Sequence, residues 1–279
     1  MDIPATPPAP PLCWWCHAAA DSREHRVKRT QLARLMGDHD HLIFESGRYS
    51  TRLNSVRAKP ILFPKIMCQK CNSQRSAPFD KAYDIFMARV WEDAEFFREK
   101  KWFTWSDVLD SAPEVGDLCR YYIKNIACRI AEIGFDVPNE LVAFLDGAEG
   151  MPHSAIVLYK DYSTYDQFKR VNLNGHYPVA NRMHNPENPE DDPLLGFTAE
   201  FQDGPIGALF WWDAVSDHGV NFCSQAVVPL RRRRDLPYHD LHAHEWKRAE
   251  VMKRGIDSGA ASDFGAIRGH ARAPRRVGA

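Results

Sequence analysis

In the stretch "CQKCNSQRS", residues 68–76, two cysteines are separated by two residues, and an asparagine comes directly after the second cysteine. A matching pair stands upstream, because Cys13 and Cys16 in "CWWCH" have the same spacing. Each Cys-x-x-Cys turn presents two sulfurs on one side of a knuckle, and zinc prefers four such ligands in a tetrahedron. The sequence therefore predicts structural zinc at Cys13, Cys16, Cys68 and Cys71.

The composition is that of a folded protein, with 44% hydrophobic and 11% aromatic residues over 279 positions. No apolar run approaches the roughly 18 residues that cross a bilayer. The N-terminal "MDIPATPPAPP" also lacks the basic start and apolar stretch of a secretory signal. We therefore expect a cytoplasmic protein with no membrane partner. In a reducing cytosol, paired cysteines bind metal more often than they form disulfides.

The formal net charge of −1 hides an uneven distribution along the chain. From Arg23 to Arg75 there are twelve Lys and Arg residues against four Asp and Glu, a formal charge of +8 for this segment. A basic block flanked by zinc-type cysteines indicates a polyanionic partner. The alternative interpretation is an ordinary solvated surface.

Helical spacing of apolar residues begins just after the second cysteine pair. From Phe79, in "FDKAYDIFMARVWEDAEFFREKKW", apolar residues recur at three- and four-residue intervals, and Pro78 suits the start of a helix. Further helices are predicted at 117–133 and 138–146. Later, "SAIVLYKDY", "LLGFTAEFQ", "IGALFWWDAV" and "NFCSQAVV" are typical of strands, and "QDGP" suits a hairpin turn. A last helix is predicted in "DLHAHEWKRAEVMKRG".

These patterns divide the chain into segments. The predicted segments are a disordered proline-rich tail at 1–11, a zinc-binding module with its following helix at 12–100, a helical segment at 101–150, an α+β portion of unknown role at 151–256 and a flexible basic tail at 257–279. No motif assigns a role to the α+β portion, which leaves substrate recognition, a homodimer contact or a protein partner open.

Residues between the cysteine pairs extend the pattern. Glu24 and His25 in "REH" follow the first pair, "ILFPKIM" supplies a second strand, and Asn72 follows Cys71 directly. Over residues 12–85 the chain resembles the HNH endonucleases, or ββα-metal nucleases, in the subgroup with two zinc knuckles. The resemblance implies an α+β fold with an N-terminal zinc-stapled treble-clef or ββα-metal module.

The resemblance also implies a chemistry. Hydrolysis of a phosphodiester needs a deprotonated water and a cation that holds charge on the phosphate and the leaving oxygen. His25 would be the general base, since histidine ionises near neutral pH. Glu24 and Asn72 would hold a catalytic Mg²⁺ or Mn²⁺ through hard oxygen ligands. The expected partner is nucleic acid, with double-stranded DNA as the expected substrate.

Simpler interpretations exist for each of these residues. Glu24 and His25 can form an ordinary surface dipeptide. Asn72 can be the N-cap of the following helix, a position that asparagine favours.

A competing catalytic pair lies in "GDHDH", residues 37–41, which offers Asp38-His39 and Asp40-His41. We prefer Glu24-His25 because it lies eight residues past Cys16, which fits a short strand leaving the first knuckle. "GDHDH" instead follows an apparent helix, "RTQLARLMG", and is typical of its exit loop.

The match departs from the family pattern at two places. Many members carry a middle asparagine about five residues before the second knuckle, where this chain has Phe63 and Pro64. Glu24 also replaces the commoner aspartate before the histidine. The alternative function is therefore a non-catalytic zinc module that binds nucleic acid or a protein partner.

Overall fold

A computed structural model describes residues 11–37, 41–46, 49–109, 112–163, 165–166, 175–176, 179–183, 194, 196–214, 217–236 and 265–269. These residues form a mixed α/β protein with a cysteine cluster near its N-terminus. The helix predicted at 240–255 lies outside the described residues. No helix in the described ranges is long and apolar enough to cross a membrane.

The segment between the cysteine pairs begins and ends with two paired strands. β1 (Ser22–His25) pairs antiparallel with β4 (Leu62–Met67), and the register shifts on either side of Arg23. Bulges of this kind bend a strand and redirect its side chains. After β4 the chain makes a wide π turn, η2 (Lys70–Arg75), and continues into α2 (Ala77–Glu92).

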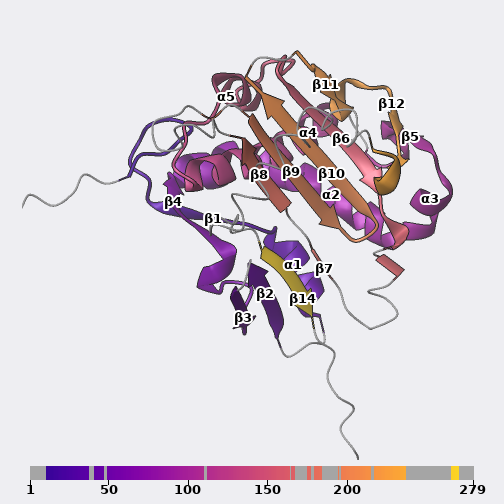
Figure 1. Ribbon diagram of the computed structural model, residues 1–279, viewed down its shortest axis with the longest axis horizontal. Helices are drawn as coiled ribbons and strands as arrows, with labels where there is room; N and C mark the ends of the chain where they lie inside the picture. The colour runs from indigo at the N-terminus through magenta and orange to yellow at the C-terminus, as the bar shows by residue number, and fades with distance from the viewer. Residues whose placement is uncertain are drawn as a thin grey trace, which may run out of the picture.

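The stretch between β1 and β4 forms a small lobe, seen below these strands in Figure 1. Its elements are α1 (Arg29–Met36), β2 (Leu42–Ser46), β3 (Tyr49–Leu53) and η1 (Lys59–Ile61). Among its described residues, seven buried side chains form a core of its own: Val27, Leu32, Leu35, Leu42, Phe44, Leu53 and Ile61.

A strand from the C-terminal region joins this lobe. β14 (Gly265–Gly269) pairs antiparallel with β2. Residues 257–279 were predicted as a flexible tail, so this strand is a difference from that expectation. Its physical basis is the backbone of β2, whose second edge offers unpaired hydrogen-bonding groups to an added strand.

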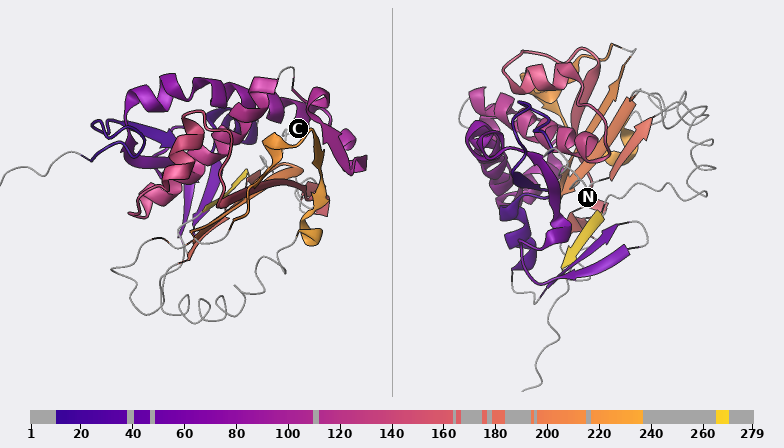
Figure 2. Two further views of the ribbon diagram at one scale, coloured as in Figure 1. Left: turned by 90° about the horizontal axis from the view of Figure 1, so that it is seen from above. Right: turned by 90° about the vertical axis from the view of Figure 1, so that its left-hand side faces the viewer.

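Two long helices cover one face of the main sheet (Figure 2). They are α2 and α4 (Ala112–Glu132), and Tyr83 of α2 stacks on Tyr121 of α4 with ring centroids 3.8 Å apart. The predicted helix at 117–133 is confirmed but starts earlier, because Pro113 is tolerated in a first turn. Two shorter helices are α3 (Ala94–Glu99) and α5 (Asn139–Leu145).

The centre of the sheet is built from three antiparallel strands that the sequence predicted. β9 (Gly196–Asp203) and β10 (Ile206–Asp213) form a hairpin at the "QDGP" turn, and β10 pairs with β6 (Ser154–Lys160). Further, shorter strands are β5 (Trp102–Thr104), β7 (Gly175–His176), β8 (Val179–Met183), β11 (Val220–Asn221), β12 (Val227–Pro229) and β13 (Arg231–Arg232). Besides η1, the described residues form 3-10 turns at η3 (Trp105–Asp107), η4 (Phe222–Ser224) and η5 (Arg233–Asp235).

One hydrophobic core connects the cysteine segment to the rest of the molecule. It includes Cys13 and Met67 from that segment, Phe86 from α2, Ile126 from α4 and Phe210 from β10. The cysteine segment therefore packs directly on the helices that cover the sheet.

Candidate metal centre and the polar cluster beside it

The four predicted zinc ligands meet in one place. The sulfur atoms of Cys13, Cys16, Cys68 and Cys71 all lie within 4.8 Å of one another, and the Sγ atoms of Cys16 and Cys68 are 3.5 Å apart. Sulfurs bound tetrahedrally to one zinc ion at about 2.3 Å lie roughly 3.8 Å apart, so the cluster has the size of a zinc site. The predicted convergence is confirmed, and the cluster can hold a metal ion such as zinc.

The surroundings of the four thiols differ. Cys13, Cys68 and Cys71 are buried, whereas Cys16 is exposed. Burial raises the pKa of Cys13 and of Cys71, while the backbone N–H of Ala18 lowers the pKa of Cys16 to about 7. A metal cation favours the thiolate form at every one of these positions.

Backbone hydrogen bonds fix the cluster to β4. The Trp14 N–H donates to the Ile66 carbonyl at 3.1 Å, which places the first knuckle alongside the end of that strand. In the second knuckle, the Cys71 N–H points at the Cys68 sulfur, 3.4 Å away. Because Cys71 lies in η2, the cluster also sets where α2 begins.

Asn72 bridges the second knuckle to β1. Its Nδ2 donates to the Ser22 hydroxyl at 2.8 Å and to the Arg23 carbonyl at 3.2 Å. Its Oδ1 is buried and accepts no hydrogen bond from any of the described residues. The interpretation of Asn72 as a helix N-cap is wrong, because α2 follows Ser76 and the Asn72 side chain bonds to β1 instead.

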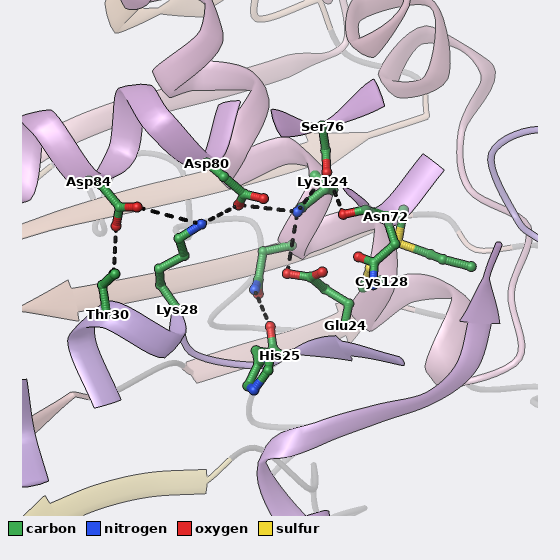
Figure 3. A network of polar contacts seen from close by, with 12 residues as sticks. Glu24, His25, Lys28, Thr30, Asn72, Ser76, Asp80, Asp84, Lys124 and Cys128 are labelled. Atoms are coloured by element: carbon green, nitrogen blue, oxygen red, sulfur yellow. Dashed lines mark hydrogen bonds and ion pairs between the residues drawn. The ribbon is translucent and has the colours of Figure 1, made fainter. Parts of the chain in front are cut away.

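Glu24 points inward to a buried lysine on α4 (Figure 3). Its Oε1 lies 3.3 Å from Lys124 Nζ, and the side chains are 12% and 0% exposed. Burial raises the pKa of Glu24, and the Lys124 charge opposes that rise. Burial alone would lower the pKa of Lys124, but the carboxylates of Glu24 and Asp80 outweigh it and raise that pKa. Lys124 therefore keeps its proton.

The ion pair is the centre of a chain of polar contacts that joins four elements. Lys124 Nζ also lies 3.4 Å from Asp80 Oδ1 on α2, and Asp80 lies 2.9 Å from Lys28 Nζ. Lys28 lies 3.8 Å from Asp84, which accepts a hydrogen bond from Thr30 of α1 at 2.5 Å. Figure 3 shows the chain running from β1 through α4 and α2 to α1.

His25 points to the other side of β1, away from Glu24 (Figure 3). Its Nε2 is 3.2 Å from the Val56 carbonyl, so Nε2 is the protonated nitrogen and Nδ1 is left to accept a proton. Burial lowers the pKa of His25, the Val56 carbonyl opposes this, and the charges of Arg29, Lys28 and Arg57 lower it further. The imidazole is therefore held neutral, with cations around it.

The predicted catalytic residues thus divide into two groups. Glu24 and Asn72 lie toward α2 and α4, while the His25 ring lies on the side of the small lobe. In the competing "GDHDH" stretch, Asp38, His39 and Asp40 lie outside the described residues, and His41 is half-buried.

Exposed basic side chains surround this region. Arg23 and Lys65 are directly opposite each other in the β1–β4 pair, and both are exposed. Arg29 and Arg57 are also exposed, and neither forms an ion pair with any described residue. Like charges placed opposite each other destabilise a strand pair, which makes an external anion a favourable addition here.

Sequence reasoning missed Lys124, Asp80 and Ser76. Lys124 stands in "YYIKNIACRIAE", where polar residues interrupt a run of apolar ones. That interruption was a usable signal, because a lysine in the middle of a buried helix requires a partner. The identity of the partner depends on tertiary contacts across 100 residues of chain, from Glu24 to Lys124.

The fold and the site together define a mixed α/β protein with a four-cysteine cluster that can hold a metal ion. Comparison of the chain with protein-family models, with curated proteins and with solved structures found no match.

Proposed function

We propose that this protein is an HNH-type endonuclease that hydrolyses phosphodiester bonds in DNA, with His25 as its general base. The observation that carries the proposal is the state of His25. Its ring is oriented by the Val56 carbonyl, it is held neutral, and Arg29 and Arg57 stand near it with no carboxylate partner among the described residues. A general base needs a free nitrogen near a place where the phosphate is bound.

The local fold supports the same assignment. In this proposal β1, β4 and α2 are the two strands and the helix of a ββα-metal or treble-clef module, and zinc on the four cysteines holds them together. Zinc is structural here, since four cysteines fill its tetrahedron and leave no open position. Its role is to set the distance between β1, which carries His25, and η2, which carries Asn72.

The reaction follows from these groups. The phosphate would lie against the exposed cations, Arg29 and Arg57, and a water molecule would sit at Nδ1 of His25. As the water oxygen forms its bond to phosphorus, Nδ1 takes the water proton and one bridging P–O bond breaks. The leaving oxygen ends protonated, with the proton drawn from solvent. The cations offset the negative charge that grows on the phosphate oxygens.

A second candidate function is binding to nucleic acid without cleavage. The Glu24–Lys124 ion pair favours it, because the carboxylate expected to hold a catalytic ion already has a buried partner. The exposed basic residues would serve phosphate contact equally well in either case.

Plasmid nicking separates the two candidates. We expect wild-type protein to cut supercoiled DNA and His25→Ala to cut roughly 10²–10⁴-fold more slowly, the usual loss on removing a general base. The matched control is His39→Ala together with His41→Ala. The assay is run with and without Mg²⁺ or Mn²⁺, because the resemblance implies an ion at Glu24 and Asn72.

Retention of DNA binding by His25→Ala, measured by gel shift, shows that the loss of cleavage is chemical. If His25→Ala cleaves at the wild-type rate and the His39→Ala/His41→Ala variant does not cleave, the general base lies in "GDHDH". If wild type and both variants bind DNA and none of them cleaves it, the second candidate function is favoured.

A further inference from the structure

Lys124 lies where a divalent ion would be expected in a site of this type. Its Nζ is surrounded by oxygen atoms: Glu24 Oε1 at 3.3 Å, Asp80 Oδ1 at 3.4 Å and Ser76 Oγ at 3.3 Å. The Lys124 side chain is fully enclosed. Two carboxylates and a hydroxyl are hard oxygen ligands of the kind that Mg²⁺ and Mn²⁺ use, and here they already share one ammonium.

The neighbouring carboxylates are also paired with lysines. Asp80 lies between two lysines, Lys124 and Lys28, and Lys28 further contacts Asp84. A divalent ion added beside Lys124 would meet the repulsion of two ammonium groups, and would have to displace at least one of them from its carboxylate. The residues present therefore do not fit a divalent ion at Glu24.

We propose that Lys124 is a permanent internal cation that takes the place of a divalent ion between Glu24 and Asp80, so that no Mg²⁺ or Mn²⁺ binds at Glu24. Lys124 is enclosed and cannot touch a phosphate, which makes it a positioning residue. Its neighbour Asn125 is also a positioning residue, since Asn125 Nδ2 donates a hydrogen bond to the Arg26 carbonyl at 3.2 Å. Through these contacts α4 fixes the end of β1 that carries His25.

Mn²⁺ binding to the zinc-loaded full-length protein tests this directly, followed by electron paramagnetic resonance in buffer freed of other divalent ions. The comparison is wild type against Glu24→Gln. We expect that wild-type protein has no Mn²⁺ site with a Kd below about 1 mM that is lost in Glu24→Gln, since even the weaker dedicated oxygen-ligand sites for divalent ions reach about that affinity. A tighter Mn²⁺ site that is lost in Glu24→Gln would overturn the proposal.

Lys124→Met supplies the converse test. With the ammonium gone, Glu24, Asp80 and Asn72 Oδ1, which accepts no hydrogen bond within the described part of the chain, are left for an added cation. We expect Mn²⁺ to raise the Tm of Lys124→Met and to leave the Tm of wild type unchanged, with Lys124→Met/Glu24→Gln as the matched control that removes one ligand. A folded Lys124→Met protein with no response to Mn²⁺ would contradict a cation position here. If this variant fails to fold, the wild-type and Glu24→Gln comparison still decides.

The inference rests on the proposed function only in calling the site a nuclease site. Mn²⁺ binding is measured independently of cleavage. A protein that does not cleave DNA and has no Glu24-dependent Mn²⁺ site would therefore refute the proposed nuclease activity but support Lys124 as the internal cation. Cleavage that needs Mg²⁺ and is lost in Glu24→Gln would support the nuclease and overturn the internal cation.

Discussion

At the scale of single residues, neighbouring positions in β1 have opposite surroundings. Glu24 faces buried Lys124, whereas His25 faces the Val56 carbonyl and a group of cations. The register shift of β1 between Arg23 and His25 lies at this point, and a bulge is a means of redirecting side chains. One strand can thus carry a buried structural ion pair and a partly exposed imidazole side by side.

The surroundings of His25 predict its titration. We expect a pKa below the ordinary value of about 6.5, because burial and the charges of Arg29, Lys28 and Arg57 all disfavour the imidazolium. A pKa lowered in the folded state means that His25 contributes stability above its unfolded pKa and loses it as pH falls through the folded one. NMR titration of the ring protons gives the value directly.

Arg57→Ala is the matched change for this titration. It removes one of the charges that lower the pKa of His25, so the measured pKa should rise while the fold is kept. A wild-type His25 that titrates above the ordinary value, or one that ignores Arg57→Ala, would show that the cations do not act on the imidazole.

At the scale of elements, the four-cysteine cluster and the network around Lys124 hold the same parts of the fold from two sides. The cysteines hold β4 and η2 together, and Asn72 extends that contact to β1. Lys124 and Asp80 hold β1 against α4 and α2. The outer face of the β1–β4 pair is left with the opposed Arg23 and Lys65.

This basic face predicts a strong dependence of DNA binding on salt. If about five phosphates are neutralised, log K against log salt concentration should have a slope of roughly −4 to −5 on duplex DNA. Arg23→Ala/Lys65→Ala should weaken binding and reduce the steepness of that slope by about 2. Lys81→Ala, an exposed lysine on α2, is the control. Fluorescence anisotropy measures both quantities, and binding that ignores salt would count against a nucleic-acid partner.

At the scale of the whole molecule, residues from the predicted segments 12–100, 101–150 and 151–256 contribute to one hydrophobic core, beside the separate core of the small lobe. Tyr83 of α2 stacks on Tyr121 of α4, and its hydroxyl donates to Asp203 of β9. Burial raises the pKa of Tyr83 well above its ordinary value, so the hydroxyl stays protonated as a donor. The cysteine segment thus packs against helices and strands from the later part of the chain.

The sequence was informative where a pattern is local. Cysteine spacing located the four-cysteine cluster, apolar periodicity located α2 and α4, and the "QDGP" turn located the β9–β10 hairpin. It could not reveal the partner of Glu24, because Lys124 approaches only when α4 packs on β1. It also could not decide whether Asn72 caps a helix, since the choice between capping a helix and bridging to a strand depends on where the β1–β4 pair lies.

The central claim is that zinc binds the four cysteines, because the proposed module relies on this ion to hold β1, β4 and η2 in place. The most direct measurement is the metal content of purified protein by elemental analysis, beside the variants Cys16→Ser and Cys223→Ser. We predict one zinc per chain in wild type and in Cys223→Ser, whose cysteine lies in η4, and loss of that zinc in Cys16→Ser. Wild-type protein without zinc, or zinc retained in full by Cys16→Ser, would contradict the account.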